Sequence, residues 1–299
     1  MNPLFSLSRA VLLRASRADA LGSLVQRTEW GRRSVRRFVA GDTIDAAVAA
    51  AAEMRARGFL ATLDRLGEAS TGARADAYAA DAITLLRAQS AAGLEPNVSV
   101  KLTALGLAEG RAAARLDDIL VAARDVQGFV RVDAEHPESL DALHDIVIAA
   151  RGVGLPVGTV LQANMRRSES DLDRLAAAGM PLRLVKGAYD PKSEGVGDNA
   201  AVDAAYRALA ERLLAAKIPT ALGTHDDSIL AALAPSAKGV AEAQLLFGVR
   251  SDLASRLVAD GWRVRIYTPY GRDWWPYALR RMAERPANLR FVLRSLVEG

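Results

Sequence analysis

The sequence predicts a (β/α)8 TIM-type barrel, with extra N-terminal helices and a final helix over the carboxyl face of the barrel. From residue 58 on, eight short β-rich runs alternate with longer amphipathic helical segments along the 299-residue chain. Several of the helical segments end at a glycine, the residue that most often closes a helix. No glycine-rich dinucleotide fingerprint is present, which favours a barrel, although eight strands in an open sheet would give the same pattern.

The expected strands are short runs rich in β-branched and other apolar residues. They are Phe59–Leu63, Val98–Leu102, Phe129–Asp133, Val157–Gln162, Leu182–Lys186, Thr220–Thr224, Val240–Leu246 and Val264–Tyr267. The segments between them carry apolar residues at helical spacing. They include Ala73–Ala92, Ala112–Asp125, Pro137–Arg151, Ser168–Ala178, Ala200–Ala216, Asp227–Ala234 and Ser251–Asp260.

The N-terminal part of the chain is expected to be helical and to pack on the barrel. An alanine-rich helix is predicted over Thr43–Met54. Residues 1–18 contain arginines and no acidic side chain, as transit peptides do, but the helical periodicity continues without a cleavage-like break. An N-terminal amphipathic helix of the mature protein is therefore favoured. We expect one domain over residues 1–299, with a helical segment at 1–57 and the barrel with its C-terminal helix at 58–299.

Composition excludes several classes of function. Hydrophobic residues make up 51% of the chain, which is ample for a sizeable core, and the net charge is only +4 with both signs interspersed. The absence of cysteine excludes disulfides, thiolate metal ligands and a cysteine nucleophile. The three histidines lack the spacing of metal ligands, so we expect no metal. No apolar run reaches the roughly 18–20 residues that cross a bilayer.

The carboxyl ends of the expected strands are unusually polar, and in a barrel that is where the chemistry is located. Acidic, basic or other hydrogen-bonding residues end almost every run. They are Asp64 with Glu68, Lys101, Asp133 with Glu135, Gln162, Arg183 with Lys186, Thr224 with His225, Glu242 with Gln244, and Tyr267. Charged residues in apolar strands are costly to bury unless they are paired or bound to a ligand. This density of polar residues favours a ligand-binding mouth.

The charges of these residues favour an anionic ligand. Cations are expected to outnumber the nearest anions; they are Lys101, Arg183, Lys186, Arg280 and Arg281. This suits a phosphate-bearing cofactor together with a carboxylate substrate. No pair resembles a nucleophile with its base, and no carboxylate cluster is arranged for a metal. A cofactor is therefore expected to carry the chemistry.

The segment Tyr267–Glu284 joins the last expected strand to an amphipathic helix. Tyr277, Arg280, Arg281 and Glu284 are three or four residues apart, so they share one helical face. Paired guanidinium groups bind a carboxylate, and tyrosine rings cover the hydrocarbon part of a small ligand. Taken alone, the arginine pair would equally suit a solvated surface helix, because the chain has 39 Lys and Arg residues.

Seen together, these motifs resemble the proline dehydrogenase family. They are Leu63–Glu68, Ser99–Gly106, Val132–Glu135, Val160–Asn164, Arg183–Tyr189, Thr224 with His225, Glu242–Gly248 and Tyr267–Glu284, in the family's order. The resemblance covers about residues 30–290. The Arg183–Tyr189 and Tyr267–Glu284 elements, each in its proper place, make it highly specific.

The resemblance implies a flavoenzyme that binds FAD non-covalently at the carboxyl face. It implies oxidation of L-proline to 1-pyrroline-5-carboxylate, the first step of proline catabolism to glutamate, with electrons passed to a membrane quinone. The chain resembles the short monofunctional type, whose product goes to a separate 1-pyrroline-5-carboxylate dehydrogenase. A cytoplasmic location is expected, and peripheral contact with the inner face of the membrane stays open because basic surface helices are common. No nucleic-acid partner is expected.

The resemblance also assigns roles to individual residues. Those around the substrate would be Arg280, Arg281 and Lys101 at the carboxylate, Tyr267, Tyr277, Tyr189 and Leu184 at the ring, and Asp133 beside it. Those that contact the flavin would be Gln162, Arg183, Val185, Lys186, Gly187, Thr224 and His225, with Arg183 near the redox-active nitrogen. Asp64, Glu68 and Glu284 would pair with the cations. A tyrosine at 267 is expected to crowd a hydroxyl group and so to favour proline over hydroxyproline.

Two other functions compete with this one. A Schiff-base enzyme of aldolase type could use Lys101 or Lys186, since both follow expected strands. A non-enzymatic polyanion-binding module would account for the pI of about 9.6, but the basic residues are dispersed and lack interleaved aromatics.

Overall fold

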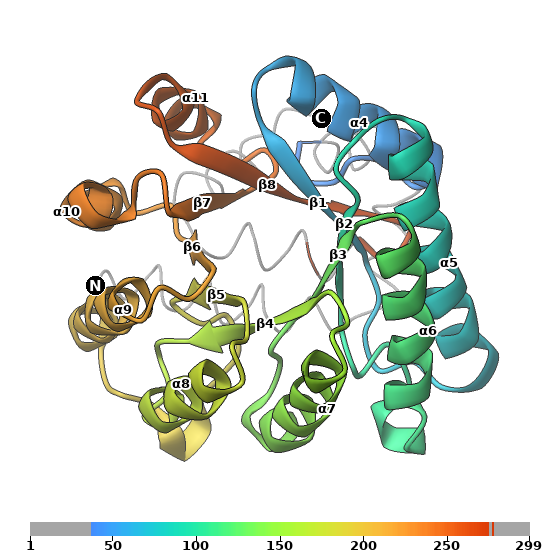
Figure 1. The fold of residues 1–299 in the computed structure, drawn as a ribbon, viewed down its shortest axis with the longest axis horizontal. Coiled ribbons are helices and arrows are strands. Elements are labelled where there is room, and N and C mark those ends of the chain that lie inside the picture. Colours follow the sequence, from blue (N-terminus) through green and yellow to red (C-terminus); the bar gives the residue numbers. More distant parts are fainter. Residues whose placement is uncertain (1–36, 275–276, 278–299) are drawn as a thin grey trace, which may run out of the picture.

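Eight parallel strands close into a barrel in the part of the chain that the structure describes, residues 37–274 and 277. In this computed structural model the strands occupy the centre and the helices surround them (Figure 1). The expected (β/α)8 barrel is therefore confirmed, including the closure that the sequence pattern left open. Closure depends on β1 and β8, which pair in parallel over six residue positions from Leu60 with Arg265 to Arg65 with Tyr270.

The strands lie close to the runs expected from the sequence. They are β1 (Leu60–Arg65), β2 (Asn97–Val100), β3 (Phe129–Val132), β4 (Val157–Gln162), β5 (Leu182–Val185), β6 (Thr220–Gly223), β7 (Ala241–Leu246) and β8 (Arg263–Tyr270). The helices are α4 (Ile44–Ala56), α5 (Gly72–Ala91), α6 (Ala112–Asp125), α7 (Leu140–Gly152), α8 (Ser168–Ala177), α9 (Asn199–Ala215), α10 (Asp227–Ala237) and α11 (Ser251–Ala259). The expected boundaries differ mainly by one or two residues at element ends.

Strand β8 is the main departure from the expected boundaries. It continues three residues beyond Tyr267, because β1 offers a partner along its whole length. Pro269 has no N–H to donate, but its carbonyl accepts a hydrogen bond from the Ala40 N–H at 2.9 Å. The Gly271 N–H donates to the Gly41 carbonyl at 2.9 Å. The segment before α4 thus ties down the end of the last strand.

Helix α4 confirms the alanine-rich helix expected near residue 43. The Thr43 hydroxyl accepts a hydrogen bond from the Ala46 N–H at 3.2 Å and so caps the helix. The expected helix over residues 1–18 and the final helix with its arginine pair lie outside the described residues. Among the helices that are described, none combines the length and the apolar character needed to cross a membrane.

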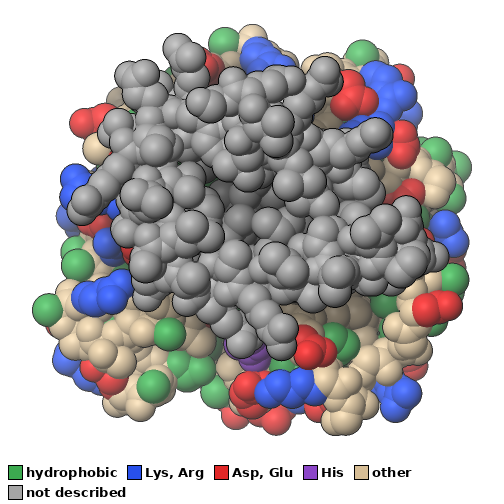
Figure 2. All heavy atoms as spheres, turned by 180° about the vertical axis from the view of Figure 1, so that it is seen from behind, with side chains coloured by type: hydrophobic (Ala, Val, Ile, Leu, Met, Phe, Trp, Pro, Cys, Tyr) green, Lys and Arg blue, Asp and Glu red, His purple; other side chains and the backbone are tan. Residues whose placement is uncertain are grey.

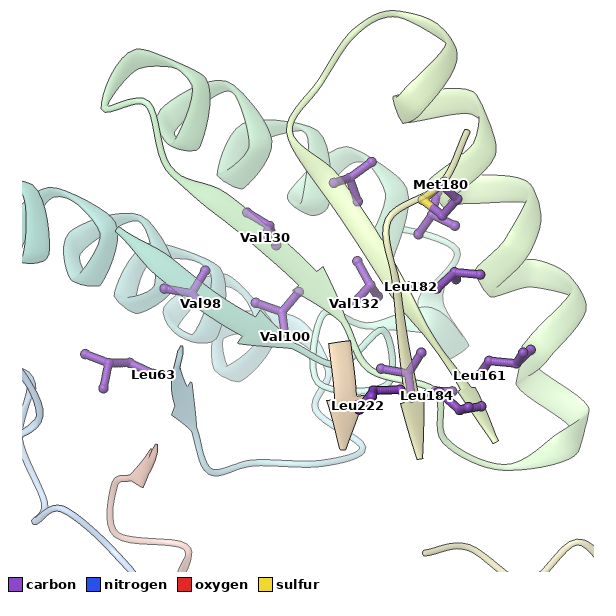
Figure 3. Packing of buried hydrophobic residues seen from close by; sticks show 14 of the residues in the cluster. Leu63, Val98, Val100, Val130, Val132, Leu161, Met180, Leu182, Leu184 and Leu222 are labelled. Carbon is purple, nitrogen blue, oxygen red and sulfur yellow. The ribbon is translucent and has the colours of Figure 1, made fainter. Parts of the chain in front are cut away.

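Apolar side chains fill the layer between the strands and the helices. Leu161, Leu184 and Leu222 occupy matching positions on β4, β5 and β6, and Figure 3 shows them close together. Each is at most 2% exposed. Burying a leucine side chain contributes about 1.5–3 kcal/mol, so this layer is a large source of stability. Alternate residues of the same strands face the barrel interior.

The barrel interior, in contrast, is strongly polar. Buried Arg131 on β3 donates to the carbonyls of Thr159 and Pro181, at 3.0 and 2.7 Å. Gly158 on β4 leaves room for this guanidinium, because a Cβ there would lie 2.7 Å from it. Backbone carbonyls thus accept from one terminal nitrogen of Arg131, whereas its buried Nε has no hydrogen-bond partner among the described residues. Burial accordingly lowers the pKa of Arg131 to about 9.

A second buried charge is neutralised by a carboxylate. Arg265 on β8 donates to Glu242 on β7 at 2.8 and 3.0 Å, and to the Ala61 carbonyl at 2.9 Å. Burial alone would raise the pKa of Glu242, but the hydrogen bonds and charge of Arg265 outweigh it and lower this pKa to about 2. The pair therefore stays ionised in the interior and links two neighbouring strands.

The Glu242 pKa predicts how folding stability depends on pH. A carboxyl with a depressed pKa in the folded state contributes stability above its unfolded pKa of about 4.3, and loses it as pH falls towards about 2. Glu242→Gln should cost about 3 kcal/mol of unfolding free energy at pH 7, and the cost should shrink across that acid window. Urea titrations from pH 2.5 to pH 7 measure it. Glu211→Gln, at an exposed position on α9, is the control and should show no such window. A pH-independent cost for Glu242→Gln would contradict the prediction.

Candidate functional site

The carboxylate of Asp133 joins residues from three strands. It directly follows β3, and its Oδ1 accepts hydrogen bonds from Ser99 Oγ on β2 and from an Arg183 Nη on β5, both at 2.8 Å. Its Oδ2 accepts from the Tyr267 hydroxyl on β8, also at 2.8 Å. Strand alternation directs these side chains into the barrel, and closure brings β8 next to β1. The result is one carboxylate held by three donors.

Lys101 and Asp64 form a buried ion pair beside this carboxylate. The Lys101 Nζ lies 2.9 Å from Asp64 Oδ1 and 3.8 Å from Asp133 Oδ2. Burial would lower the pKa of Lys101, but Asp64 and the other anionic groups raise it well above its ordinary value. Burial raises the pKa of Asp64, and Lys101 opposes that shift. The lysine is therefore a fixed cation. Asp64 is its partner, and the family resemblance had implied that Asp64 would pair with a cation of the site.

Arg183 is held on several sides. Its Nε donates to Gln244 Oε1 on β7 at 2.6 Å, and one terminal nitrogen donates to Asp133. Its guanidinium carbon lies 5.1 Å from the centre of the Tyr267 ring, within the range of a cation–π contact. Burial raises the pKa of Tyr267 well above its usual value, so its hydroxyl stays protonated and donates to Asp133.

The β6 side of the interior presents small residues. Ala221 is in register with Arg183, and Gly223 is in register with Val185. A Cβ added at Gly223 would lie 2.9 Å from Val185 Cγ1, so the two strands are packed closely here. The Val185 side chain therefore fills the space over Gly223, and β6 itself adds little side-chain bulk beside Arg183.

Gln162 at the end of β4 is oriented by the loop that follows β3. Its Nε2 donates to the Glu135 carbonyl at 3.0 Å, which directs its Oε1 elsewhere. The Glu135 carboxylate in turn accepts from the Thr103 hydroxyl at 2.6 Å. Burial raises the pKa of Glu135, and the hydrogen bonds from Thr103 oppose this shift.

Lys186, after β5, contacts two carboxylates. Its Nζ pairs with Asp203 on α9 and with Asp226, which caps α10, the latter at 3.0 Å. Nearby, Thr224 Oγ1 accepts from the Asp226 N–H at 3.2 Å, and His225 Nε2 accepts from the Leu246 N–H at 3.0 Å. Thr224 and His225 thus lie on the same rim as Lys186, as expected.

The loop after β5 is shaped by Gly187 and Asn164. Gly187 has φ +114°, and a Cβ there would collide with the Asn164 amide. Asn164 Nδ2 donates to the Tyr189 carbonyl at 3.2 Å, and its backbone N–H donates to the Lys186 carbonyl at 2.8 Å. The Tyr189 ring meets the His136 ring edge-on, with centroids 4.7 Å apart. Tyr189 is therefore fixed at the mouth from two neighbouring loops.

The structure brings most of the expected site residues to this end of the barrel, with some exceptions. Leu184 lies in the apolar layer, because its neighbour Arg183 faces the interior and successive strand residues alternate. Glu68 is exposed in the segment after β1, and Tyr277 is buried. Arg280, Arg281 and Glu284 lie outside the described residues.

One expectation about charge is wrong for the described residues. The cations Lys101, Arg183 and Lys186 do not outnumber their neighbouring anions, because each has at least one carboxylate within 3.0 Å. The strand pattern could not show this for Lys186, since Asp203 lies within α9 and Asp226 caps α10. The site's described part is therefore close to charge-balanced.

Several residues of the site were missed or given no role from the sequence. Ser99 and Gln244 contact Asp133 and Arg183, and Asn164 shapes the Tyr189 loop. Period-two alternation was the available signal for the first two, because Ser99 lies two residues before Lys101 and Gln244 two residues after Glu242. Nothing in the sequence pattern singled out Asn164.

The alternative functions find no support in this geometry. A Schiff-base lysine needs a lowered pKa, whereas ion pairs raise the pKa of both Lys101 and Lys186 against the effect of burial. Among the described residues, no three His, Asp or Glu side chains gather in a way that could hold a metal. On the described rim of the face in Figure 2, basic and acidic side chains are interspersed.

Comparison with known proteins identifies relatives of the chain. A family model described as proline dehydrogenase matches residues 47–294. The proline dehydrogenase of Deinococcus radiodurans is 35% identical over 98% of this chain and 99% of that protein. Proline dehydrogenase 1 of Bacillus subtilis is 34% identical over 89% of this chain and 92% of that protein.

A solved structure supports the fold. Proline utilization A (PutA) of Bdellovibrio bacteriovorus superposes with a TM-score of 0.78 over 85% of this chain, at 23% identity. This chain spans about a third of the length of that protein (33%). At this identity the match bears on the fold alone, and it agrees with the closed barrel described above.

The Gly187 geometry predicts a substitution effect. Gly187→Ala should lower the free energy of unfolding by more than about 2 kcal/mol, because alanine is strained at this positive φ and its Cβ would displace the Asn164 side chain. Gly154→Ala is the matched control, because Gly154 also has a positive φ (+79°) but no atom within 4 Å of an added Cβ. That variant should lose only about 1 kcal/mol. Urea unfolding of both proteins gives the comparison, and equal losses would show that the Asn164 contact is unimportant.

Proposed function

The chain belongs to the proline dehydrogenase family, and from that premise we propose that it oxidises L-proline to 1-pyrroline-5-carboxylate with non-covalently bound FAD, as the first step of proline catabolism. Membership of this family implies a flavin cofactor. The observation that supports the proposal best is the cluster of Asp133, Arg183, Tyr267 and Lys101 at the barrel mouth.

The residues present fit a flavin. Arg183 offers a fixed cation, and the Nε2 of Gln162 is held by the Glu135 carbonyl, so its Oε1 can accept a hydrogen bond from a ring N–H. The small residues Ala221 and Gly223 on β6 add little side-chain bulk beside Arg183. We propose that these residues hold the isoalloxazine ring, and that Lys186, Gly187, Thr224 and His225 line the rest of the cofactor. A bound flavin supplies the acceptor for the hydride taken from the substrate. A guanidinium beside it favours the anionic reduced form.

The substrate would lie over Lys101 and against Tyr267. Lys101 is a buried cation whose charge Asp64 balances, so it can donate to a carboxylate without carrying a net charge into the site. Tyr189, held by Asn164 and His136, and Tyr277 would enclose the ring. On the sequence pattern, Arg280 and Arg281 would complete the carboxylate clamp and Glu284 and Glu68 would pair with them. Holding the reacting carbon in one orientation and excluding water are the main contributions of these side chains.

We propose that Asp133 orients its neighbours and does not act as the acceptor of the substrate's proton. Both its oxygens already accept hydrogen bonds from protein donors. We propose that it orients Arg183 and Tyr267 next to the substrate amine. Tyr267 places a ring where a hydroxyl on the substrate would lie, so proline should be preferred over hydroxyproline.

The electron acceptor and the partners follow from the family resemblance. We propose that a membrane quinone accepts the electrons and that a separate 1-pyrroline-5-carboxylate dehydrogenase takes the product. With these partners, we propose a cytoplasmic location with peripheral contact at the inner face of the membrane.

The purified protein gives the direct test. Expressed with flavin available, it should show flavin absorbance that bleaches when L-proline is added without oxygen. Heat denaturation should release FAD into solution, because the binding is non-covalent. A protein that binds no added FAD and leaves L-proline unchanged would overturn the proposal.

Tyr267→Phe tests the contact with Asp133. The variant loses the 2.8 Å hydrogen bond to a carboxylate, a contact worth about 1.5–3 kcal/mol, so kcat/KM for proline should fall about tenfold or more. Tyr270→Phe on the same strand is the control, because the buried Tyr270 hydroxyl has no hydrogen-bond partner among the described residues. Steady-state kinetics with a soluble quinone measure both variants. Equal kcat/KM for the two would contradict the role of Tyr267.

A further inference from the structure

We propose that Gln244 is a positioning residue that fixes the guanidinium of Arg183 towards the flavin. The inference rests on the proposed function, in which Arg183 lies beside the cofactor. Gln244 and Arg183 are 6% and 5% exposed, and Arg183 Nε donates to Gln244 Oε1 at 2.6 Å. The two side chains come from β7 and β5, with β6 between them.

The orientation of the Gln244 amide is fixed by Glu242, on the side away from Arg183. Its Nε2 donates to Glu242 Oε2 at 3.1 Å, and a carboxylate only accepts hydrogen bonds. Glu242 is itself held by Arg265 and is ionised, since its pKa is lowered to about 2. The amide can therefore turn only one way, with its oxygen towards Arg183. A flipped amide would place an N–H against a guanidinium N–H.

Arg265 anchors this arrangement to the rest of the barrel. It donates to Glu242, to the Ala61 carbonyl on β1, and to Glu95 ahead of β2 at 2.6 Å. A continuous series of hydrogen bonds thus runs from Glu95 through Arg265, Glu242 and Gln244 to Arg183. From Arg265 to Arg183 the side chains of this series are largely buried, so these hydrogen bonds constrain one another.

The side chain at position 244 is a neutral amide, although a carboxylate could make the same contact with Arg183. Asp133 and Gln244 together fix two edges of the Arg183 guanidinium, which sets its plane. A carboxylate in place of Gln244 would give the same hydrogen bond but would add a second negative charge beside a guanidinium that is already paired with Asp133. The amide positions the guanidinium towards an electron-rich ligand without adding that charge. Because positive charge stabilises the reduced flavin, loss of this contact should lower the reduction potential.

The midpoint potential of the bound flavin is the measurement. Gln244→Met should lower the midpoint potential by about 30 mV for this two-electron couple. This shift corresponds to an about tenfold smaller ratio of reduced to oxidised flavin when both proteins are poised at the wild-type midpoint potential. Gln89→Met is the matched control. Gln89 is fully buried and also uses both amide atoms, to the Leu85 carbonyl and the Asn97 N–H, but it lies on α5. It should lose comparable stability and leave the potential unchanged.

Coupling between the two residues sharpens the test. Arg183→Met should lower the potential further, and adding Gln244→Met to it should change nothing more, because the amide acts only through the guanidinium. If Gln244→Met does not fold, Gln244→Asn, which is too short to bridge Arg183 and Glu242, gives the same comparison.

The outcomes separate this inference from the proposed function. If the wild type binds flavin and oxidises proline while Gln244→Met keeps the wild-type potential, the positioning role is overturned and the function stands. An additional fall on top of Arg183→Met would also overturn it. If the wild-type protein binds no flavin, the proposed function fails and this inference fails with it.

Discussion

The whole site depends on one requirement, that every charge inside a closed barrel must find its partner there. Asp133 pairs with the charge of Arg183 and also accepts hydrogen bonds from the neutral hydroxyls of Ser99 and Tyr267. An unpaired buried charge is destabilising by several kcal/mol. The partners come from separate strands, and only closure between β1 and β8 brings them all together. The arrangement of the site therefore depends on closure of the barrel.

The polar interior also explains why the helical layer must be strongly apolar. Pairs such as Glu242 with Arg265 replace interactions with water and add little net stability. The stabilising contribution must come from the outer layer, where Leu161, Leu184 and Leu222 pack between strands and helices. Alternation along each strand separates the two tasks, with chemistry inside and packing outside. Leu184 and Arg183 are neighbours in the chain that serve one task each.

Local pattern was enough to predict the elements and much of the mouth. Polar residues at strand ends, such as Lys101, Asp133 and Arg183, were found because each interrupts an apolar run. Closure was not predictable, since pairing of β1 with β8 joins residues about 200 positions apart without any local signal. Asp203 was not predictable for the same reason, because it lies on α9 and contacts Lys186 only in the folded chain. Asn164 was invisible for another reason, because its role comes from contact with the backbone at Gly187.

The charge balance of the described site bears on how an amino acid would be recognised. Lys101 with Asp64, and Arg183 with Asp133, form two pairs that sum to zero charge. A zwitterionic amino acid also carries no net charge, so such a floor can present separate donors and acceptors to it without attracting other anions. Tight binding of the carboxylate then requires further cations that are not neutralised by the barrel. We propose Arg280 and Arg281 for this role, in which case recognition would be divided between a preorganised barrel floor and the C-terminal segment.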